Sequence, residues 1–187
     1  MTLYGREDWG SPPSTVTKDR NDSPMNRIHI VGRKNHGKTT LVVALIEELT
    51  RRGVVVGSIK HSSHHHVLDT PGKDSFRHRA AGADPAAVIT RDTVAVFSAR
   101  PVTGDSYAAL EPLFAGCEVV LVEGDVDASA RKVEVWREAV GGEPLAALRG
   151  DIIAVVSDGQ PAVAVPVWPR SDVAALADHL LRVTGGA

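Results

Sequence analysis

Short apolar runs alternate with amphipathic stretches along most of the chain. Strands are predicted where apolar residues dominate, at 28–31, 54–60, 117–123, 132–137 and 152–156. Helices are predicted where apolar residues recur three and four positions apart, at 38–52, 73–83, 107–115 and 171–183. This alternation predicts βαβ units with right-handed crossovers, and therefore an α/β fold with a mostly parallel sheet.

Two segments depart from this alternation. Residues 86–91 and 93–99 are two short apolar runs joined at Asp92, which predicts a β-hairpin at the edge of the sheet. Residues 1–26 carry glycine, proline and many charges without an apolar period, which predicts a mobile tail. Residues 27–187 show no internal repeat, and we expect them to form a single domain.

Composition narrows the class of protein. Hydrophobic residues make up 43% of the 187 residues but aromatic residues only 4%, so Val, Ala, Leu and Ile must fill the core. That bias suits a three-layer fold, with helices covering both faces of a parallel sheet. The net charge of -2 gives no sign of general binding to nucleic acid or to membranes. Cys117 is the single cysteine, so no internal disulfide can form, and a cytoplasmic location is expected.

The most informative motif follows the first predicted strand. It reads Gly32-Arg33-Lys34-Asn35-His36-Gly37-Lys38-Thr39-Thr40 and opens a predicted helix, which is the G-x-x-x-x-G-K-[ST] pattern of a P-loop (Walker A). Its backbone amides and the start of the helix favour phosphate. Lys38 would reach the β- and γ-phosphates, and the Thr39 hydroxyl would bind Mg²⁺. The motif therefore predicts a nucleoside triphosphate site.

Polar residues after other strands could complete this site, because ligands of open α/β sheets lie at the carboxyl ends of the strands. Glu123 could hold the metal, or could be a solvated acid at a strand end. Asp69 could bind Mg²⁺ or its waters and is the candidate catalytic base, and Lys73 could contact phosphate. Asp158 could accept hydrogen bonds from guanine, although it equally suits a turn.

A histidine-rich loop offers a different chemistry. His61, His64, His65 and His66 could bind nickel or zinc, but no cysteine lies nearby and their spacing matches no structural zinc signature. An exposed polar loop explains the same pattern.

Several further segments carry a more specific pattern: Ser58-Ile59-Lys60-His61, Asp69-Thr70-Pro71-Gly72-Lys73-Asp74-Ser75-Phe76-Arg77-His78-Arg79, Ala81-Gly82-Ala83, Leu121-Val122-Glu123-Gly124 and Val155-Val156-Ser157-Asp158. With the P-loop, and in this order over about residues 27–160, they resemble the MobB family of molybdopterin-guanine dinucleotide biosynthesis adapter proteins.

The resemblance implies a P-loop fold that binds GTP, hydrolyses it weakly and forms a homodimer. It also implies an accessory role beside a MobA-like guanylyltransferase, which attaches GMP to molybdenum cofactor, with molybdopterin or the cofactor as a further ligand. Thr39 and Glu123 correspond to magnesium-side groups, and Asp69 to the family's loop aspartate. The family has small residues where this P-loop has Asn35-His36, so a side chain is expected near the phosphates.

Three functions are consistent with these residues. The first is a GTP-binding adapter with slow hydrolysis, because no arginine finger or water-positioning glutamine stands out. The second is a nickel- or zinc-delivery GTPase that uses the histidine loop. The third is a small-molecule phosphotransferase with Asp69 as its base.

Overall fold

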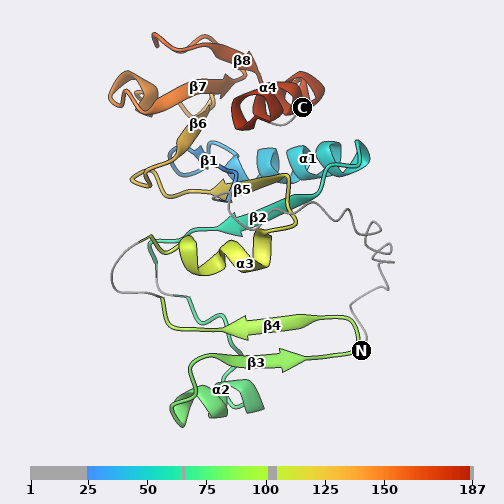
Figure 1. Cartoon of the computed structure of the whole chain (residues 1–187). Coiled ribbons are helices and arrows are strands. Elements are labelled where there is room, and N and C mark those ends of the chain that lie inside the picture. The colour runs from blue at the N-terminus through green and yellow to red at the C-terminus, as the bar shows by residue number, and fades with distance from the viewer. Residues whose placement is uncertain (1–24, 65, 101–104, 186–187) are drawn as a thin grey trace, which may run out of the picture.

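A six-stranded parallel sheet forms the centre of the protein, in a computed structural model that describes residues 25–64, 66–100 and 105–185 (Figure 1). Across the sheet the strands follow the order β2-β5-β1-β6-β7-β8, and each neighbouring pair is parallel. Their bounds are β1 (Arg27–Val31), β2 (Val56–Lys60), β5 (Val119–Glu123), β6 (Arg131–Trp136), β7 (Ile152–Ser157) and β8 (Val167–Pro169).

Helices cover both faces of this sheet. The main core packs α1 (Lys38–Arg51) and α4 (Val173–Thr184) against side chains such as Val119 and Leu121 of β5. Val120 and Val122 point to the other face and contact a smaller cluster with Tyr107 and Phe114. On that face lie the 3₁₀ turn η1 (Ala108–Leu110) and the short helix α3 (Glu111–Phe114). The predicted three-layer α/β fold is thus confirmed.

The remaining elements form a separate unit beyond β2 (Figure 1). Helix α2 (Asp74–Ala80) packs on a two-stranded antiparallel sheet of β3 (Ala86–Ile89) and β4 (Val94–Phe97). The predicted hairpin is therefore present, but its place at an edge of the large sheet was wrong. Among the described residues, β3 and β4 pair only with each other, and the hairpin packs on α2.

Two elements were not predicted from the sequence. These are β8 and the 3₁₀ turn η2 (Leu145–Ala147), each of three residues. Prolines surround β8, and the sheet tolerates them because β8 is its outermost strand. The helix predicted at 107–115 is present as the 3₁₀ turn η1 followed directly by α3, with Leu110 and Glu111 both in the right-handed helical region.

The folded part begins slightly earlier than the sequence suggests. Met25 packs on the smaller cluster, and Asn26 donates a side-chain hydrogen bond of 2.8 Å to the Glu118 carbonyl. Residues 1–24 of the predicted tail lie outside the described residues. Among the helices that the structure describes, none combines the length and the apolar character that a bilayer crossing requires.

Candidate functional site

The P-loop forms a compact turn between β1 and α1. Gly32, Asn35 and Gly37 have φ values of 145°, 69° and 80°, which favour glycine or asparagine. A Cβ atom at Gly32 would lie 2.5 Å from the Val135 carbonyl oxygen, so the turn passes directly over β6. Gly37 is the N-cap of α1, and no side chain caps that helix end. The motif thus adopts the strand–loop–helix context that phosphate binding requires.

Lys38 and Thr39, the residues of the motif expected to bind phosphate and Mg²⁺, are held in different ways. Lys38 donates a hydrogen bond of 2.8 Å from Nζ to the Arg33 carbonyl, within the loop itself. The Thr39 hydroxyl donates a 2.8 Å hydrogen bond to Oε1 of Glu123, at the end of the neighbouring strand β5. Glu123 is buried, with 6% of its surface exposed. The structure therefore brings together the two residues expected on the magnesium side.

A residue that the sequence argument did not assign lies beside them. Lys60, the last residue of β2, donates from Nζ to the same Oε1 of Glu123. Burial lowers the pKa of the Lys38 ammonium, the negative charge of Glu123 raises it, and the positive charge of Lys60 lowers it further. The available signal was that Lys60, like Glu123, ends a predicted strand.

The His36 side chain, which was expected near the phosphates, is directed into the protein. Its ring is buried, with 2% of the residue exposed, and Nδ1 accepts a 2.9 Å hydrogen bond from the backbone amide of Arg137. The ring also lies 6.5 Å from that of Trp136, centroid to centroid. Burial lowers the pKa of the His36 imidazole, which favours the neutral ring that can accept a hydrogen bond. His36 therefore anchors the loop to β6.

The exposed part of the loop presents Arg33, Lys34, Asn35 and Thr40 to solvent. The Arg33 side chain reaches the Glu143 carbonyl at 3.2 Å, which ties the loop to the segment after β6. Arg33 and Lys34 therefore place positive charge on the outer surface of the loop.

Arg170, between β8 and α4, was also missed. It donates hydrogen bonds of 3.3 and 3.0 Å to the carbonyls of His36 and Gly37. Burial lowers the pKa of the Arg170 guanidinium, the positive charge of Arg137 lowers it further, and the negative charge of Asp158 opposes both. No motif marks Arg170, because its contact depends on how β8 follows β7.

Asp158 lies after β7 on the same edge of the sheet as the P-loop. It accepts a 2.9 Å hydrogen bond from the Glu138 amide and one of 3.1 Å from Nε of Arg137. These contacts fix the carboxylate beside the end of β6, and each oxygen retains a free lone pair.

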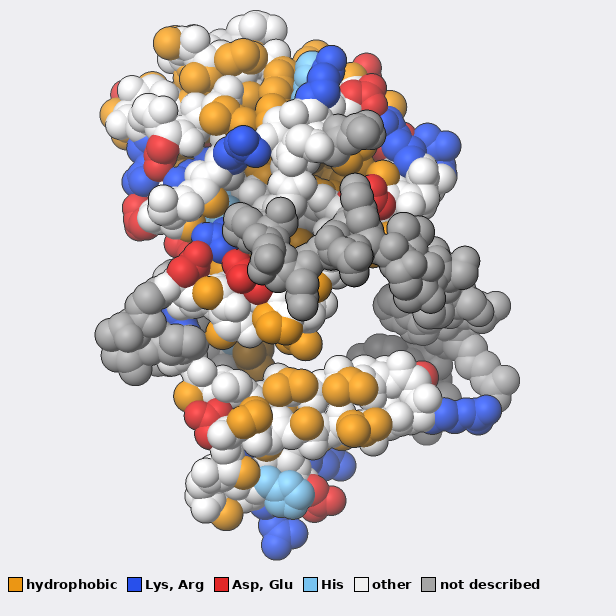
Figure 2. Space-filling model, viewed as in Figure 1, with side chains coloured by type: hydrophobic (Ala, Val, Ile, Leu, Met, Phe, Trp, Pro, Cys, Tyr) orange, Lys and Arg blue, Asp and Glu red, His pale blue; other side chains and the backbone are white. Residues whose placement is uncertain are grey.

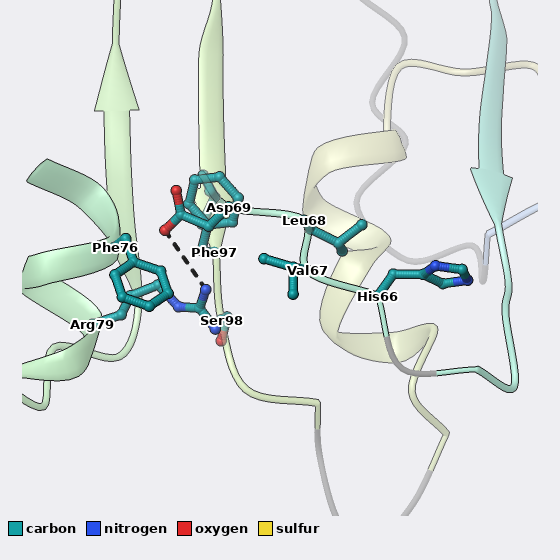
Figure 3. A pocket seen from close by; sticks show the side chains of 9 residues that line it. His66, Val67, Leu68, Asp69, Phe76, Arg79, Phe97 and Ser98 are labelled. Atoms are coloured by element: carbon teal, nitrogen blue, oxygen red, sulfur yellow. Dashed lines mark ion pairs between the residues drawn. The ribbon is translucent and has the colours of Figure 1, made fainter. Parts of the chain in front are cut away.

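Asp69 and Lys73 lie elsewhere, in the unit formed by α2 and the hairpin. The Asp69 carboxylate accepts a 2.8 Å hydrogen bond from Ser75 and faces Arg79 at 3.7 Å (Figure 3). It lines a hollow of about 340 Å³ whose other walls include Phe76 and Phe97. Lys73 is exposed at the start of α2. The expected place of Asp69 beside Thr39 and Glu123 is therefore not what the structure shows, because the loop after β2 carries it away.

The histidine loop does not assemble a metal centre in the described part of the chain. The rings of His64 and His66 lie 6.4 Å apart, and His66 bonds to Ser62. No three His, Cys, Asp or Glu side chains converge among residues 25–64, 66–100 and 105–185. His65 lies outside the described residues.

Comparisons with known proteins agree with this architecture. A family model described as molybdopterin guanine dinucleotide synthesis protein B matches residues 27–158. The molybdopterin-guanine dinucleotide biosynthesis adapter protein of Escherichia coli is 32% identical over 149 residues, which cover 78% of this chain and 85% of that protein. The probable adapter protein of Bacillus subtilis is 32% identical over 136 residues, covering 71% and 76%.

Solved structures give the same result. The crystal structure of Bacillus subtilis MobB has a TM-score of 0.64 at 26% identity, covering 83% of this chain and 96% of that one. That of a MobB homologue from Bacillus stearothermophilus has a TM-score of 0.61 at 26% identity, covering 87% and 100%. With the family model spanning the P-loop, Glu123 and Asp158, these matches show that the chain belongs to the MobB family.

Proposed function

We propose that this protein binds Mg²⁺–GTP and acts as an adapter in molybdopterin-guanine dinucleotide synthesis. The observation that carries the proposal is the Thr39–Glu123 hydrogen bond, which joins the P-loop to an acid at the adjacent strand end. Within the described part of the chain, the Lys38 ammonium hydrogen-bonds only to a loop carbonyl, that of Arg33. A phosphate can replace that carbonyl without breaking an ion pair.

The residues present suit magnesium. Mg²⁺ prefers oxygen ligands and keeps several waters, and Thr39 and Glu123 offer a hydroxyl and a carboxylate side by side. Thr39 would bind the ion directly, and Glu123 would hold it through water. The ion would neutralise the charge of the β- and γ-phosphates.

Guanine selectivity is assigned to Asp158. Its carboxylate is held at the end of β7, and guanine presents N1–H and a 2-amino group as donors, whereas adenine has an acceptor at N1. Isothermal titration of the protein with Mg²⁺–GTP and Mg²⁺–ATP tests this assignment. We expect tighter binding of GTP; tighter binding of ATP would refute it.

Hydrolysis is expected to be slow. Among the described residues, Thr39 and Lys60 donate to Glu123, and Lys38 donates to a loop carbonyl. None of these side chains is a glutamine or an arginine. The chain's glutamine, Gln160, follows β7, on the side assigned to the base. In other P-loop proteins a glutamine or an arginine finger at the γ-phosphate supplies most of the acceleration. The phosphotransferase alternative also loses its base, because Asp69 lies in the α2–hairpin unit.

A homodimer is proposed to form through the hairpin. Ile89, Val94 and Val96 share the outer face of β3 and β4 and are 78%, 64% and 52% exposed. Figure 2 shows this face as a row of apolar side chains. The inner face already packs on α2, so a second copy is the occupant we assign to the outer face.

The proposed partner is a MobA-like guanylyltransferase, with molybdopterin or molybdenum cofactor as the molecule on which the pair acts. A pull-down from extract of the source cells, with and without GTP, tests this role. Recovery of a molybdenum-cofactor nucleotidyltransferase supports it. If the transferase is absent from both samples while the nucleotide binds, the adapter role fails and the binding site stands.

A further inference from the structure

Lys60 links the candidate metal acid to the edge strand of the large sheet. It pairs in register with Glu123 across β2 and β5, so both side chains leave the sheet at the same level. Its ammonium and the Thr39 hydroxyl donate to the same oxygen of Glu123. One carboxylate oxygen thus joins the P-loop to the last residue of β2.

The order of the strands sets the direction of a bound nucleotide. Arg137 and Asp158 follow β6 and β7 on one side of the P-loop, whereas Glu123 and Lys60 end β5 and β2 on the other. With the base placed beside Asp158, the phosphates extend across the P-loop toward β5. The terminal phosphate then comes closest to Glu123 and Lys60.

The charges favour an exchange of partners. The Glu123 side chain is 8% exposed, and a buried carboxylate of this kind requires a cation. In the structure Lys60 supplies that charge, but Mg²⁺ arriving with the nucleotide would supply twice as much. The Lys60 side chain is 62% exposed, so it can move without loss of core packing. A released ammonium at this position would face the negative charge of the terminal phosphate.

We propose that Lys60 is a ligand of the terminal phosphate, exchanging Glu123 for the γ-phosphate when Mg²⁺–GTP binds and so distinguishing GTP from GDP. This inference rests on the nucleotide binding proposed above. It adds a second phosphate-binding lysine from β2, outside the P-loop motif.

Isothermal titration with GDP and with a non-hydrolysable GTP analogue, both with Mg²⁺, tests the proposal. The variants are Lys60→Gln, Lys60→Met and the charge-preserving Lys60→Arg. Arg91→Gln, at the exposed turn of the hairpin, is the matched control for loss of one positive charge. Thermal unfolding of each variant checks that it is folded.

We expect Lys60→Gln and Lys60→Met to weaken binding of the GTP analogue by about tenfold and to change the affinity for GDP by less than about twofold. Lys60→Arg should retain most of the preference for the GTP analogue over GDP, and Arg91→Gln should bind both nucleotides as the wild type does. Equal losses for both nucleotides, or no loss for either, would overturn the proposal. If the wild type binds neither nucleotide, the proposed function itself fails, and that result is distinct from altered selectivity in a protein that binds.

Discussion

The ring of His36 and the backbone amide of Arg137 are joined by a hydrogen bond of 2.9 Å, although 101 positions separate them in sequence. The bond fastens the P-loop to the end of β6, beside the residues that approach Asp158. A buried side chain therefore connects the P-loop to the segment after β6, and so links the proposed phosphate and base subsites.

Acid should weaken this connection. Burial lowers the pKa of His36 below its usual 6.5, so the unfolded chain takes up a proton first as pH falls. The stability contributed by neutral His36 is therefore complete above about pH 6.5 and is lost as pH falls toward the folded-state pKa. Denaturant unfolding at a series of pH values measures this loss.

Burial also lowers the pKa of His29, so this residue should add to the loss of stability in acid. A variant is therefore needed to separate the contributions of His36 and His29. In His36→Asn the amide oxygen can still accept from Arg137 and does not titrate. We expect a flatter dependence of stability on pH in this variant than in the wild type. An unchanged slope would assign the acid sensitivity to other groups.

Lys38→Ala should abolish tight binding of the triphosphate while the fold remains. Among the described residues the ammonium hydrogen-bonds only to the Arg33 carbonyl, so its loss should remove little stability from the folded state. Loss of charge-assisted bonds to phosphate should reduce affinity by at least about a hundredfold. Titration calorimetry and circular dichroism measure the two effects, and unchanged affinity would contradict the assigned role.

Gly32→Ala should destabilise the protein and remove nucleotide binding. The new Cβ would lie 2.5 Å from the Val135 carbonyl at a φ of 145°, which predicts a loss of about 2–4 kcal/mol. Gly53→Ala is the control: its φ is also positive, at 81°, but no atom lies within 4 Å. It should cost only about 1–2 kcal/mol in urea unfolding. Equal losses would show that the contact with β6 is unimportant.

Arg170→Ala should loosen the P-loop without removing it. Two hydrogen bonds to the His36 and Gly37 carbonyls are lost, which predicts about 1–2 kcal/mol of stability and a roughly fivefold weaker affinity for GTP. Arg170→Lys can restore one of these hydrogen bonds, so its stability and its affinity for GTP should fall between those of the wild type and Arg170→Ala. A full loss of binding in Arg170→Ala would instead indicate direct contact with the ligand.

The hairpin surface can be tested by oligomeric state. Val94→Asp together with Val96→Asp places charge on the outer face, and sedimentation should show a monomer if that face forms the dimer. Leu113→Asp, on an exposed residue of α3, is the control and should leave the dimer intact. A wild type that sediments as a monomer would refute the proposed dimer.

The sequence alone determined the elements whose signals are local. The glycines and Lys38 of the P-loop, the apolar strands and the amphipathic helix after the loop all follow from spacing along the chain, because backbone freedom and helical periodicity are properties of neighbouring residues. Glu123 could also be proposed from the sequence, since it ends an apolar strand and the carboxyl ends of parallel strands lie at one edge of the sheet.

Tertiary structure decided which of these residues meet. Only the pairing of β2 with β5 brings Lys60 to Glu123, and only the packing of the segment after β8 brings Arg170 to the loop carbonyls. Asp69 was misplaced because the path of a loop depends on what it packs against, here α2 and the hairpin. Contacts between distant segments depend on strand order and on the packing of side chains, and no spacing within a single segment records them.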